Sequence, residues 1–188
     1  MSSDHPLILA VDTASSCSTI AITAGDMHDG SLLAAISLNS KITHSRRLLT
    51  GIEWLLKEND VSLGDMDGFA VGLGPGSFTG LRIGMATMKG LAVAMEKPLL
   101  GVSTLDALAL CCSGDLPLCA LLDARKKEVY RAWYQKDACG IYRAKGIIQA
   151  LKPEELAWEI TTPSLLVGDG TFTYGSFLQE TAEAQPFI

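Results

Sequence analysis

The sequence is poor in positive charge, in histidine and in long apolar runs, and each shortage argues against a class of function. Its 188 residues include 15 Lys and Arg against 21 Asp and Glu, which gives a formal net charge of −6. Nucleic-acid affinity comes mostly from Lys and Arg that displace counterions, so this chain is not expected to hold a polynucleotide alone. Its apolar stretches, such as Gly90–Met95 and Leu116–Leu122, are much shorter than the ~20 residues that span a bilayer. We therefore expect no membrane-spanning segment.

The cysteines and histidines follow no metal-binding pattern. The five cysteines are odd in number and show no C-x-x-C spacing, which argues against a disulfide framework and against a zinc site. A metallopeptidase would need clustered ligands, typically two histidines four residues apart on a helix, but His5, His28 and His44 are far apart. No glycine-flanked serine forms the G-x-S-x-G elbow of a serine hydrolase. The sequence therefore nominates no catalytic residue and no metal ligand.

The N-terminus does not resemble a secretory signal. Met1–Pro6 lacks the basic segment that opens such a signal, and the apolar residues after it reach the polar Asp12 within the length of one strand. We therefore expect a cytoplasmic protein.

Apolar periodicity predicts an α/β fold. In the first half, strands are expected at Leu7–Val11, Ser18–Ala24, Leu32–Leu38, Gly68–Leu73 and Pro98–Val102. Helices are expected from a cap at Thr43 or Ser45 to about Asn59, over Phe78–Glu96, and from Ser103 to Cys112. A break in composition at Gly114–Pro117 places a domain boundary there, with a first lobe at residues 1–114 and a shorter second lobe at 115–188.

The second half repeats the beginning of the first. Leu118–Leu122 runs into Asp123 as Leu7–Val11 runs into Asp12, and an alternating strand follows in each case. Later elements are expected as a helix that begins at Pro153, a strand at residues 165–167, and a helix over Thr171–Ala184. The shared order indicates a duplicated unit.

The segment Gly74–Arg82 lies between a predicted buried strand and a predicted helix, where backbone N–H groups attract anions. It is not a Walker A loop, because no Lys-Ser or Lys-Thr follows its last glycine. A tight turn capped by Ser77 or Thr79, with glycines that admit close packing, is the favoured interpretation over direct phosphate binding.

Two strand ends carry an aspartate but no glycine cradle. ATPases of the sugar-kinase type hold phosphates on two glycine-containing loops, each with an Asp that orients magnesium, whereas the residues after Asp12 and Asp123 contain no glycine. The phosphate site therefore looks degraded. The residues expected to lie near any nucleotide are Asp12, Thr13, Gly76, Ser77 and Asp123.

The helix predicted over Phe78–Glu96 is apolar on more than one face. At 100° per residue, Arg82, Lys89 and Glu96 form one narrow polar stripe. One apolar face holds Leu81, Met85, Met88, Ala92 and Met95, and a face of small or apolar residues holds Gly80, Gly84, Thr87, Gly90, Leu91 and Ala94. A helix that packs on its own sheet needs one apolar face, so we expect the second to meet another helix or another chain.

The preceding helix has a similar feature. Trp54, with Arg47, Gly51 and Glu58 at helical spacing, projects away from the core face that is expected at Leu48, Leu49, Ile52, Leu55 and Leu56. Trp54 covers either a neighbouring helix of its own chain or a partner, because Arg and Trp are typical interface anchors.

Five segments in order resemble the bacterial TsaB (YeaZ) family. They are Ile8–Ala14, His44–Leu49, the G-P-G-S-F-T-G-L-R-I-G run at Gly74–Gly84, Gly101–Leu105, and Asp123–Arg125 with Glu128–Tyr130. The family is related to TsaD, a transferase that carries a different version of the glycine-rich run.

The resemblance implies an actin-like ATPase (ASKHA) fold of two ribonuclease-H-like lobes, with a second lobe shorter than in relatives. It implies a role in making N6-threonylcarbamoyladenosine (t6A) at position 37 of tRNAs that read ANN codons. In this role the subunit is catalytically silent and activates TsaD. The ATPase TsaE joins the same complex, and this subunit contacts tRNA only indirectly, through that complex. The resemblance implies no metal and no cofactor for this subunit, and ATP or ADP only at its interface with TsaD.

The surface that the resemblance assigns to TsaD lies on the first-lobe helices, and homodimers are implied on the same helices. The residues carried over are Arg47, Gly51, Trp54, Leu81, Gly84, Met85, Met88, Ala92 and Met95. The alternative function is an enzyme, either an ATP-dependent phosphotransferase that uses Asp12 and Asp123 or a glycoprotease-like peptidase. A third interpretation is that the start of the helix, at Ser77, forms one wall of a nucleotide site shared with TsaD.

Overall fold

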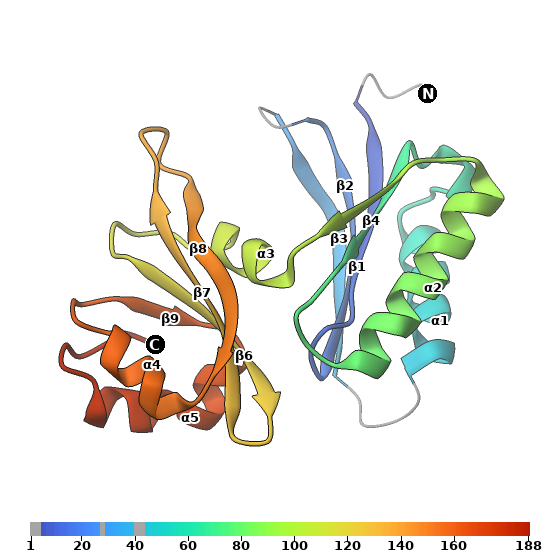
Figure 1. Cartoon of the computed structure of the whole chain (residues 1–188). Helices are drawn as coiled ribbons and strands as arrows, with labels where there is room; N and C mark the ends of the chain where they lie inside the picture. The colour runs from blue at the N-terminus through green and yellow to red at the C-terminus, as the bar shows by residue number, and fades with distance from the viewer. Residues whose placement is uncertain (1–4, 27–28, 40–43) are drawn as a thin grey trace. The chain divides into compact units, whose positions relative to one another are not determined.

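Two β-sheets with the same internal strand order form the framework of the chain (Figure 1). The computed structural model describes residues 5–26, 29–39 and 44–188, and side chains in the first helix from residue 47 onward. Thr43, His28 and the side chains of His44 and Ser45 lie outside the described part, and so do the predictions that involve them. The chain divides into two units, Met1–Val102 and Ser103–Ile188.

The first unit is a five-stranded sheet with two long helices on one face. Its strands are β1 (Leu7–Asp12), β2 (Cys17–Ala24), β3 (Ser31–Asn39), β4 (Gly68–Gly72) and β5 (Leu99–Val102), in the spatial order β3-β2-β1-β4-β5. The first three pair antiparallel, and β4 and β5 continue parallel to β1. Helix α1 (His44–Glu58) packs over β2 and β3, helix α2 (Phe78–Met95) packs over β1, β4 and β5, and a short 3-10 helix covers Leu63–Asp65.

The second unit repeats this order with one strand fewer. Its elements are α3 (Thr104–Leu110), β6 (Leu118–Arg125), β7 (Glu128–Lys136), β8 (Tyr142–Leu151), α4 (Pro153–Glu159), β9 (Leu165–Val167) and α5 (Gly170–Thr181). The sheet order is β8-β7-β6-β9, with β9 parallel to β6. Each unit therefore has the antiparallel start and parallel continuation of a ribonuclease-H-like lobe. This confirms the predicted actin-like α/β fold and the predicted duplication.

The predicted domain boundary after residue 114 differs from the observed division between Val102 and Ser103. Helix α3 belongs to the second unit because Leu105 and Ala109 are buried in one cluster with Leu118 and Ala120 of β6. The break in composition at Gly114–Pro117 marks the loop after α3, whereas the burial of Leu105 and Ala109 shows that α3 itself belongs to the second unit.

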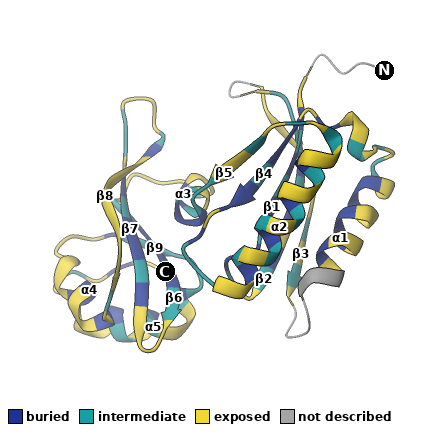
Figure 2. Cartoon of the chain, turned by 45° about the vertical axis from the view of Figure 1, so that its right-hand side comes forward, coloured by how far each residue is buried: buried dark blue, intermediate teal, exposed yellow. Residues whose placement is uncertain are grey.

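Burial confirms most of the core face predicted for α1. Leu48, Ile52, Leu55 and Leu56 are buried, whereas Leu49 is 46% exposed and does not belong to the core. The hydrophobic residues of β1 that face the helices, Leu7, Leu9 and Val11, lie in the same cluster. Figure 2 shows this division, with buried residues on the sheet-facing sides of α1 and α2 and exposed residues on their outer sides.

The first turn of α2 rests against the loop that follows β1. The Thr13 hydroxyl donates a hydrogen bond to the Gly80 carbonyl (2.8 Å), and the Ser77 N–H donates to the Ala14 carbonyl (2.6 Å). The Ser77 hydroxyl accepts from the Gly80 N–H (3.2 Å), which confirms Ser77 as the helix cap. The chain itself therefore supplies partners at this helix start.

Two helical glycines make this contact possible. A Cβ added at Gly80 would collide with the Thr13 carbonyl oxygen, and one added at Gly84 would collide with the Thr13 hydroxyl. Thr13 is only 1% exposed. Close packing thus explains the spacing of Gly80 and Gly84 in α2, and it fixes how the helix is rotated about its own axis.

We predict that Gly84→Ala lowers the free energy of unfolding by about 1–3 kcal/mol, because the new methyl group must displace the buried Thr13 hydroxyl. The matched control is Gly90→Ala in the same helix, where an added Cβ meets nothing within 4 Å. Since alanine is the better helix former, the control should gain about 0.5–1 kcal/mol. Urea unfolding of both variants measures the difference, and equal effects would contradict the proposed packing role of Gly84.

Candidate protein-binding surface

The two strand-end aspartates make the same local contact in the two units. Oδ1 of Asp12 accepts a hydrogen bond from the Ala14 N–H (2.7 Å), and Oδ1 of Asp123 accepts one from the Arg125 N–H (2.8 Å). Each carboxylate thus stabilises the turn that follows its own strand. These equivalent positions confirm the predicted repeat, and the predicted nucleotide role of Asp12, Thr13, Gly76, Ser77 and Asp123 stays a prediction.

A third aspartate lies beside Asp123. Oδ1 of Asp169, in the Gly168–Gly170 turn, accepts a hydrogen bond from the Asp123 N–H (3.0 Å). Burial raises the pKa of Asp169, the hydrogen bond from Asp123 opposes this, and the negative charge of Asp123 adds to it. The glycines on either side pack against the backbone of Leu121. The turn therefore serves the packing of α5 on β6.

Within the described residues, no three His, Cys, Asp or Glu side chains gather in a way that could hold a metal ion. Burial raises the pKa of the Cys119 thiol, which lies in the core beside β9.

In the described part of the chain, no helix combines the length and apolar character needed to cross a bilayer.

Three residues assigned to a partner surface on α2 are instead core residues. Gly84, Met88 and Ala92 are buried, and Met88 is 0% exposed. The assignment was wrong for these three because the contact of Gly80 and Gly84 with Thr13 turns this face toward the sheet. Leu81, Met85 and Met95 are half-buried along the margins of the helix.

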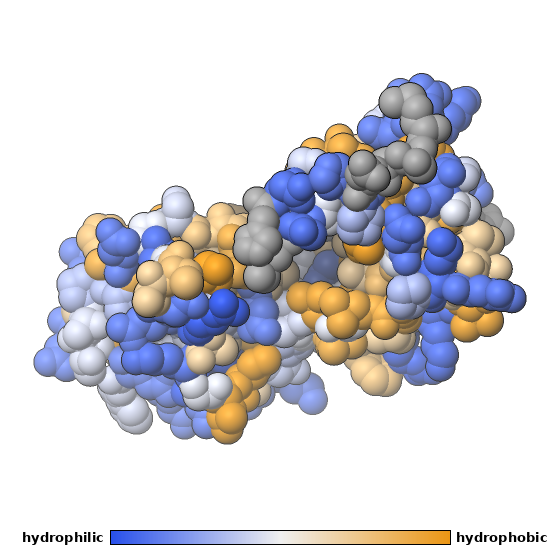
Figure 3. Space-filling view, turned by 90° about the horizontal axis from the view of Figure 1, so that it is seen from above, coloured by the Kyte–Doolittle hydropathy of each residue, from blue (hydrophilic) through white to orange (hydrophobic). Residues whose placement is uncertain are grey.

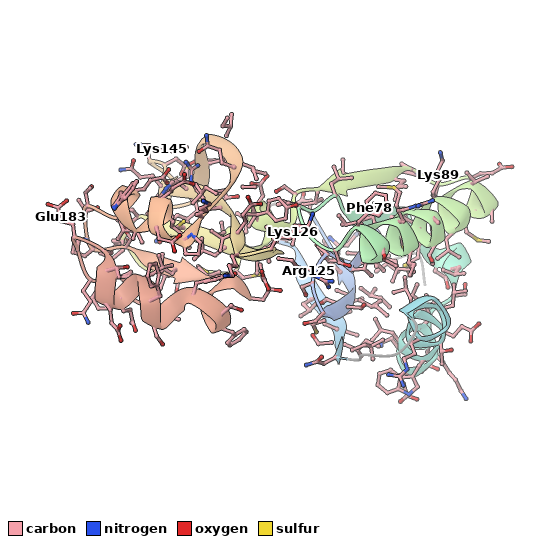
Figure 4. All side chains as sticks on the ribbon, turned by 60° about the horizontal axis from the view of Figure 1, so that its bottom comes forward. Phe78, Lys89, Arg125, Lys126, Lys145 and Glu183 are labelled. Carbon is pink, nitrogen blue, oxygen red and sulfur yellow. The ribbon has the colours of Figure 1, made fainter. Side chains whose placement is uncertain are left out.

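The outer face of α2 is apolar with two positive charges. Phe78 is 73% exposed and Val93 is 71% exposed, and the small Ala86 lies between them. Arg82 and Lys89 are exposed on the same face, with the Arg82 guanidinium carbon 5.3 Å from the centre of the Phe78 ring. Figure 4 labels Phe78 and Lys89, which lie along this helix. We call Phe78, Arg82, Ala86, Lys89, Gly90 and Val93 the outer face of α2.

Shallow hollows border this face. One of about 370 Å³ is lined by Gly72, Leu73, Phe78, Leu81, Arg82, Met85 and Ala86. Another of about 440 Å³ is lined by Phe78, Thr79, Arg82, Ile83, Ala86 and Thr87, and a third of about 410 Å³ lies between the end of α2 and Leu99. Leu73, in the first hollow, is 54% exposed. Hollows beside protruding apolar side chains suit the insertion of side chains from another protein.

The sequence pattern missed the outermost residues of this face. Phe78, Arg82, Ala86, Lys89 and Val93 recur at spacings of three and four, so they share the stripe that Arg82 and Lys89 define. The signal that could have identified this face is the presence of the apolar Phe78 and Val93 on the same stripe as the charged Arg82 and Lys89. The space-filling view in Figure 3 shows apolar patches between hydrophilic side chains on the face that is turned to the viewer.

The residues predicted on α1 line a separate hollow. Arg47 and Trp54 are exposed, with Trp54 at 51%, as expected for a side chain that points away from the core. Gly51 is buried against Ile20, Ile36 and Leu38, and its assignment to a partner surface stays a prediction. The hollow of about 440 Å³ lies between α1 and the edge strand β3 and is lined by Ile36, Leu38, Arg47, Thr50, Gly51 and Trp54.

Comparisons with known proteins agree with this architecture. A family model described as TsaD, tRNA N6-adenosine threonylcarbamoyltransferase, matches residues 32–151. The tRNA threonylcarbamoyladenosine biosynthesis protein TsaB of Escherichia coli is 39% identical over 78% of this chain and 63% of its own length. TsaB of Haemophilus influenzae is 30% identical over 92% of this chain and 76% of its own length. The chain thus spans less than two thirds of the Escherichia coli relative.

Solved structures give the same result. YeaZ from Pseudomonas aeruginosa superposes with a TM-score of 0.78 at 32% identity, over 97% of this chain and 84% of that one. A second Pseudomonas aeruginosa structure, described as an uncharacterized protein with similarity to the peptidase YeaZ, has the same TM-score at 31% identity and covers 97% of this chain and 85% of that one. Sequence identity of this extent, together with the two repeated sheets, shows that the chain belongs to the TsaB (YeaZ) family.

Proposed function

We propose that this chain takes part in the biosynthesis of t6A at position 37 of ANN-decoding tRNAs, as a non-catalytic subunit that activates a TsaD-type transferase. The names of its relatives support the pathway. In this proposal the ATPase TsaE joins the assembly, tRNA is bound only by the complex, and the reaction takes place in the cytoplasm. The subunit itself needs no metal or cofactor, and ATP or ADP binds only at the interface with TsaD.

The observation that carries the proposal is the outer face of α2. Phe78 and Val93 protrude from it, and the residues between them are small or positively charged. Burial of an apolar side chain of this size stabilises a complex by roughly 1.5–3 kcal/mol. Arg82 and Lys89 would add specificity for a partner with carboxylates at the matching positions. A protein surface of this composition suits a second protein better than a small substrate.

The contacts of the glycine-rich segment support a silent subunit. Two N–H groups at the start of α2 already have acceptors within the chain, because the Ser77 N–H donates to the Ala14 carbonyl and the Gly80 N–H donates to the Ser77 hydroxyl. A nucleotide phosphate bound there would have to compete with these intramolecular hydrogen bonds. These intramolecular hydrogen bonds favour a role of the glycine-rich segment in protein docking over a role in phosphate transfer.

We predict that Val93→Glu lowers the affinity for TsaD by at least about tenfold, because the interface would lose apolar burial and gain a desolvated carboxylate. Phe172→Glu is the matched control, since Phe172 is 92% exposed on α5 of the second unit. Isothermal titration of purified TsaD with each variant measures the change. Unchanged affinity of Val93→Glu, or an equal loss for Phe172→Glu, would contradict docking through the outer face of α2.

We also predict that the isolated chain does not bind ATP at micromolar concentration, whereas its complex with TsaD does. Equilibrium dialysis with radiolabelled ATP measures both. Micromolar binding by the isolated chain that disappears in Asp12→Ala would support the phosphotransferase alternative. It would overturn the proposal of a silent subunit.

A further inference from the structure

Helices α4 and α5 cover the same face of the second sheet. Leu156 of α4 and Leu178 of α5 lie in one buried cluster with Leu121 of β6. The two helices also pack against each other (Figure 1). Their outward sides therefore form one helical surface, which belongs to the second unit alone.

This surface carries two highly exposed aromatic side chains. Trp158 on α4 is 76% exposed, and Phe172 on α5 is 92% exposed. Aromatic residues supply much of the apolar area that protein interfaces bury, and tryptophan is a frequent anchor there. Two such residues on adjoining helices favour contact with another protein.

The net negative charge of the chain lies in the segment that builds these helices. Residues 1–152 contain all 15 Lys and Arg and 15 of the 21 Asp and Glu, so their formal charges cancel. Residues 153–188 contain the other six acidic residues and no Lys, Arg or His, which gives the segment a formal charge of −6. Charge gathered in this way attracts cations within a Debye length of roughly 10 Å.

Most of the outward acidic groups are not neutralised by the chain itself. Glu159 forms an ion pair with Arg131 (2.7 Å). Glu154, Glu180 and Glu183 are exposed, and none of them forms an ion pair with a described residue. Glu180 lies in the last turn of α5, where a negative charge opposes the helix dipole. Helix stability therefore does not explain its presence.

On α4 the negative charge and the aromatic ring adjoin. Glu154 and Glu155 precede Trp158 by four and three residues, which places the three side chains on one side of the helix. A guanidinium group can stack on an indole ring and pair with a carboxylate at the same time. This side of α4 therefore suits an arginine side chain.

The start of α5 repeats the start of α2 in sequence but not in charge. The run G-D-G-T-F-T at Gly168–Thr173 corresponds to G-P-G-S-F-T at Gly74–Thr79, and each follows the strand that pairs parallel with the first strand of its unit. The phenylalanine is highly exposed in both runs. Helix α2 continues with Arg82, whereas α5 contains no cation and ends near Glu180. The two units thus present an aromatic side chain in surroundings of opposite charge.

We propose that the outward surface of α4 and α5, with Glu154, Trp158, Phe172 and Glu180, binds an arginine-rich segment of a partner protein. Charge complementarity identifies this occupant. The anionic backbone of a nucleic acid would be repelled, and a second copy of this chain has no excess of positive charge to offer. The proposal goes beyond the proposed function and does not depend on it, since it uses residues of the second unit.

Dye-labelled octa-arginine is the probe, and fluorescence anisotropy measures its dissociation constant. Glu154→Gln/Glu180→Gln removes two charges from the surface, and we expect this variant to bind the peptide roughly five- to tenfold more weakly than the wild type. Glu53→Gln/Glu58→Gln is the matched control, because it removes the same charge from exposed positions on α1, beside the exposed Trp54. Its affinity should stay within about twofold of the wild type.

A second comparison separates stacking from charge. We expect the wild type to bind octa-arginine about three- to tenfold more tightly than octa-lysine, because a guanidinium stacks on an indole ring better than an ammonium does. Trp158→Leu should lose most of this preference. Circular dichroism should show the same unfolding midpoint, within a few degrees, for the wild type and all variants.

Equal losses of affinity for the two Glu→Gln pairs would show that only the total charge attracts the peptide, and would overturn the proposal. An arginine preference that survives in Trp158→Leu would overturn it as well, and so would a wild type that does not bind octa-arginine at about 1 mM. The binding of TsaD by Val93→Glu reports separately on the proposed function.

Discussion

The contact between Thr13 and the start of α2 determines which surface the first unit presents. The Thr13 hydroxyl donates to the Gly80 carbonyl, and the helix lies so close that neither Gly80 nor Gly84 could carry a side chain. Residues at intervals of four from Gly80, ending with Met88 and Ala92, consequently face the sheet. The opposite side of the helix, with Phe78 and Val93, is left exposed. A packing constraint on one face thus creates the apolar surface on the other.

Much of the fold could be predicted from the sequence because its central strands are continuous apolar runs. Strand β6 is buried on both faces, with Leu118 and Ala120 in one cluster and Cys119 and Leu121 in the other, and this is why its sequence does not alternate. Strand β8 was not predicted, because nearly all of its residues are exposed and carry no buried alternation. Its place in the sheet comes from backbone pairing with β7.

The sequence nominated α1 and α2 as the helices of a partner surface, and that role stays a prediction. Helical spacing shows which residues share a face, but the direction of each face depends on tertiary contacts that the spacing does not contain. The methionines of α2 illustrate this, because Met88 is fully buried while Met85, three residues earlier, lies at the margin of an exposed hollow. Gly51 likewise allows close approach by side chains of its own sheet. Trp54 is half exposed, which confirms that it points away from the aliphatic face, whereas its role as an interface anchor stays a prediction.

In the proposed complex, a second protein covers the outer face of α2. Hydroxyl-radical footprinting with mass spectrometry tests it directly, because Phe78 on this face and Phe172 on α5 are both highly exposed aromatic residues in the free chain. We expect saturation with TsaD to protect Phe78 strongly from oxidation and to leave Phe172 unchanged. Equal oxidation of Phe78 in the free chain and in the complex would contradict it.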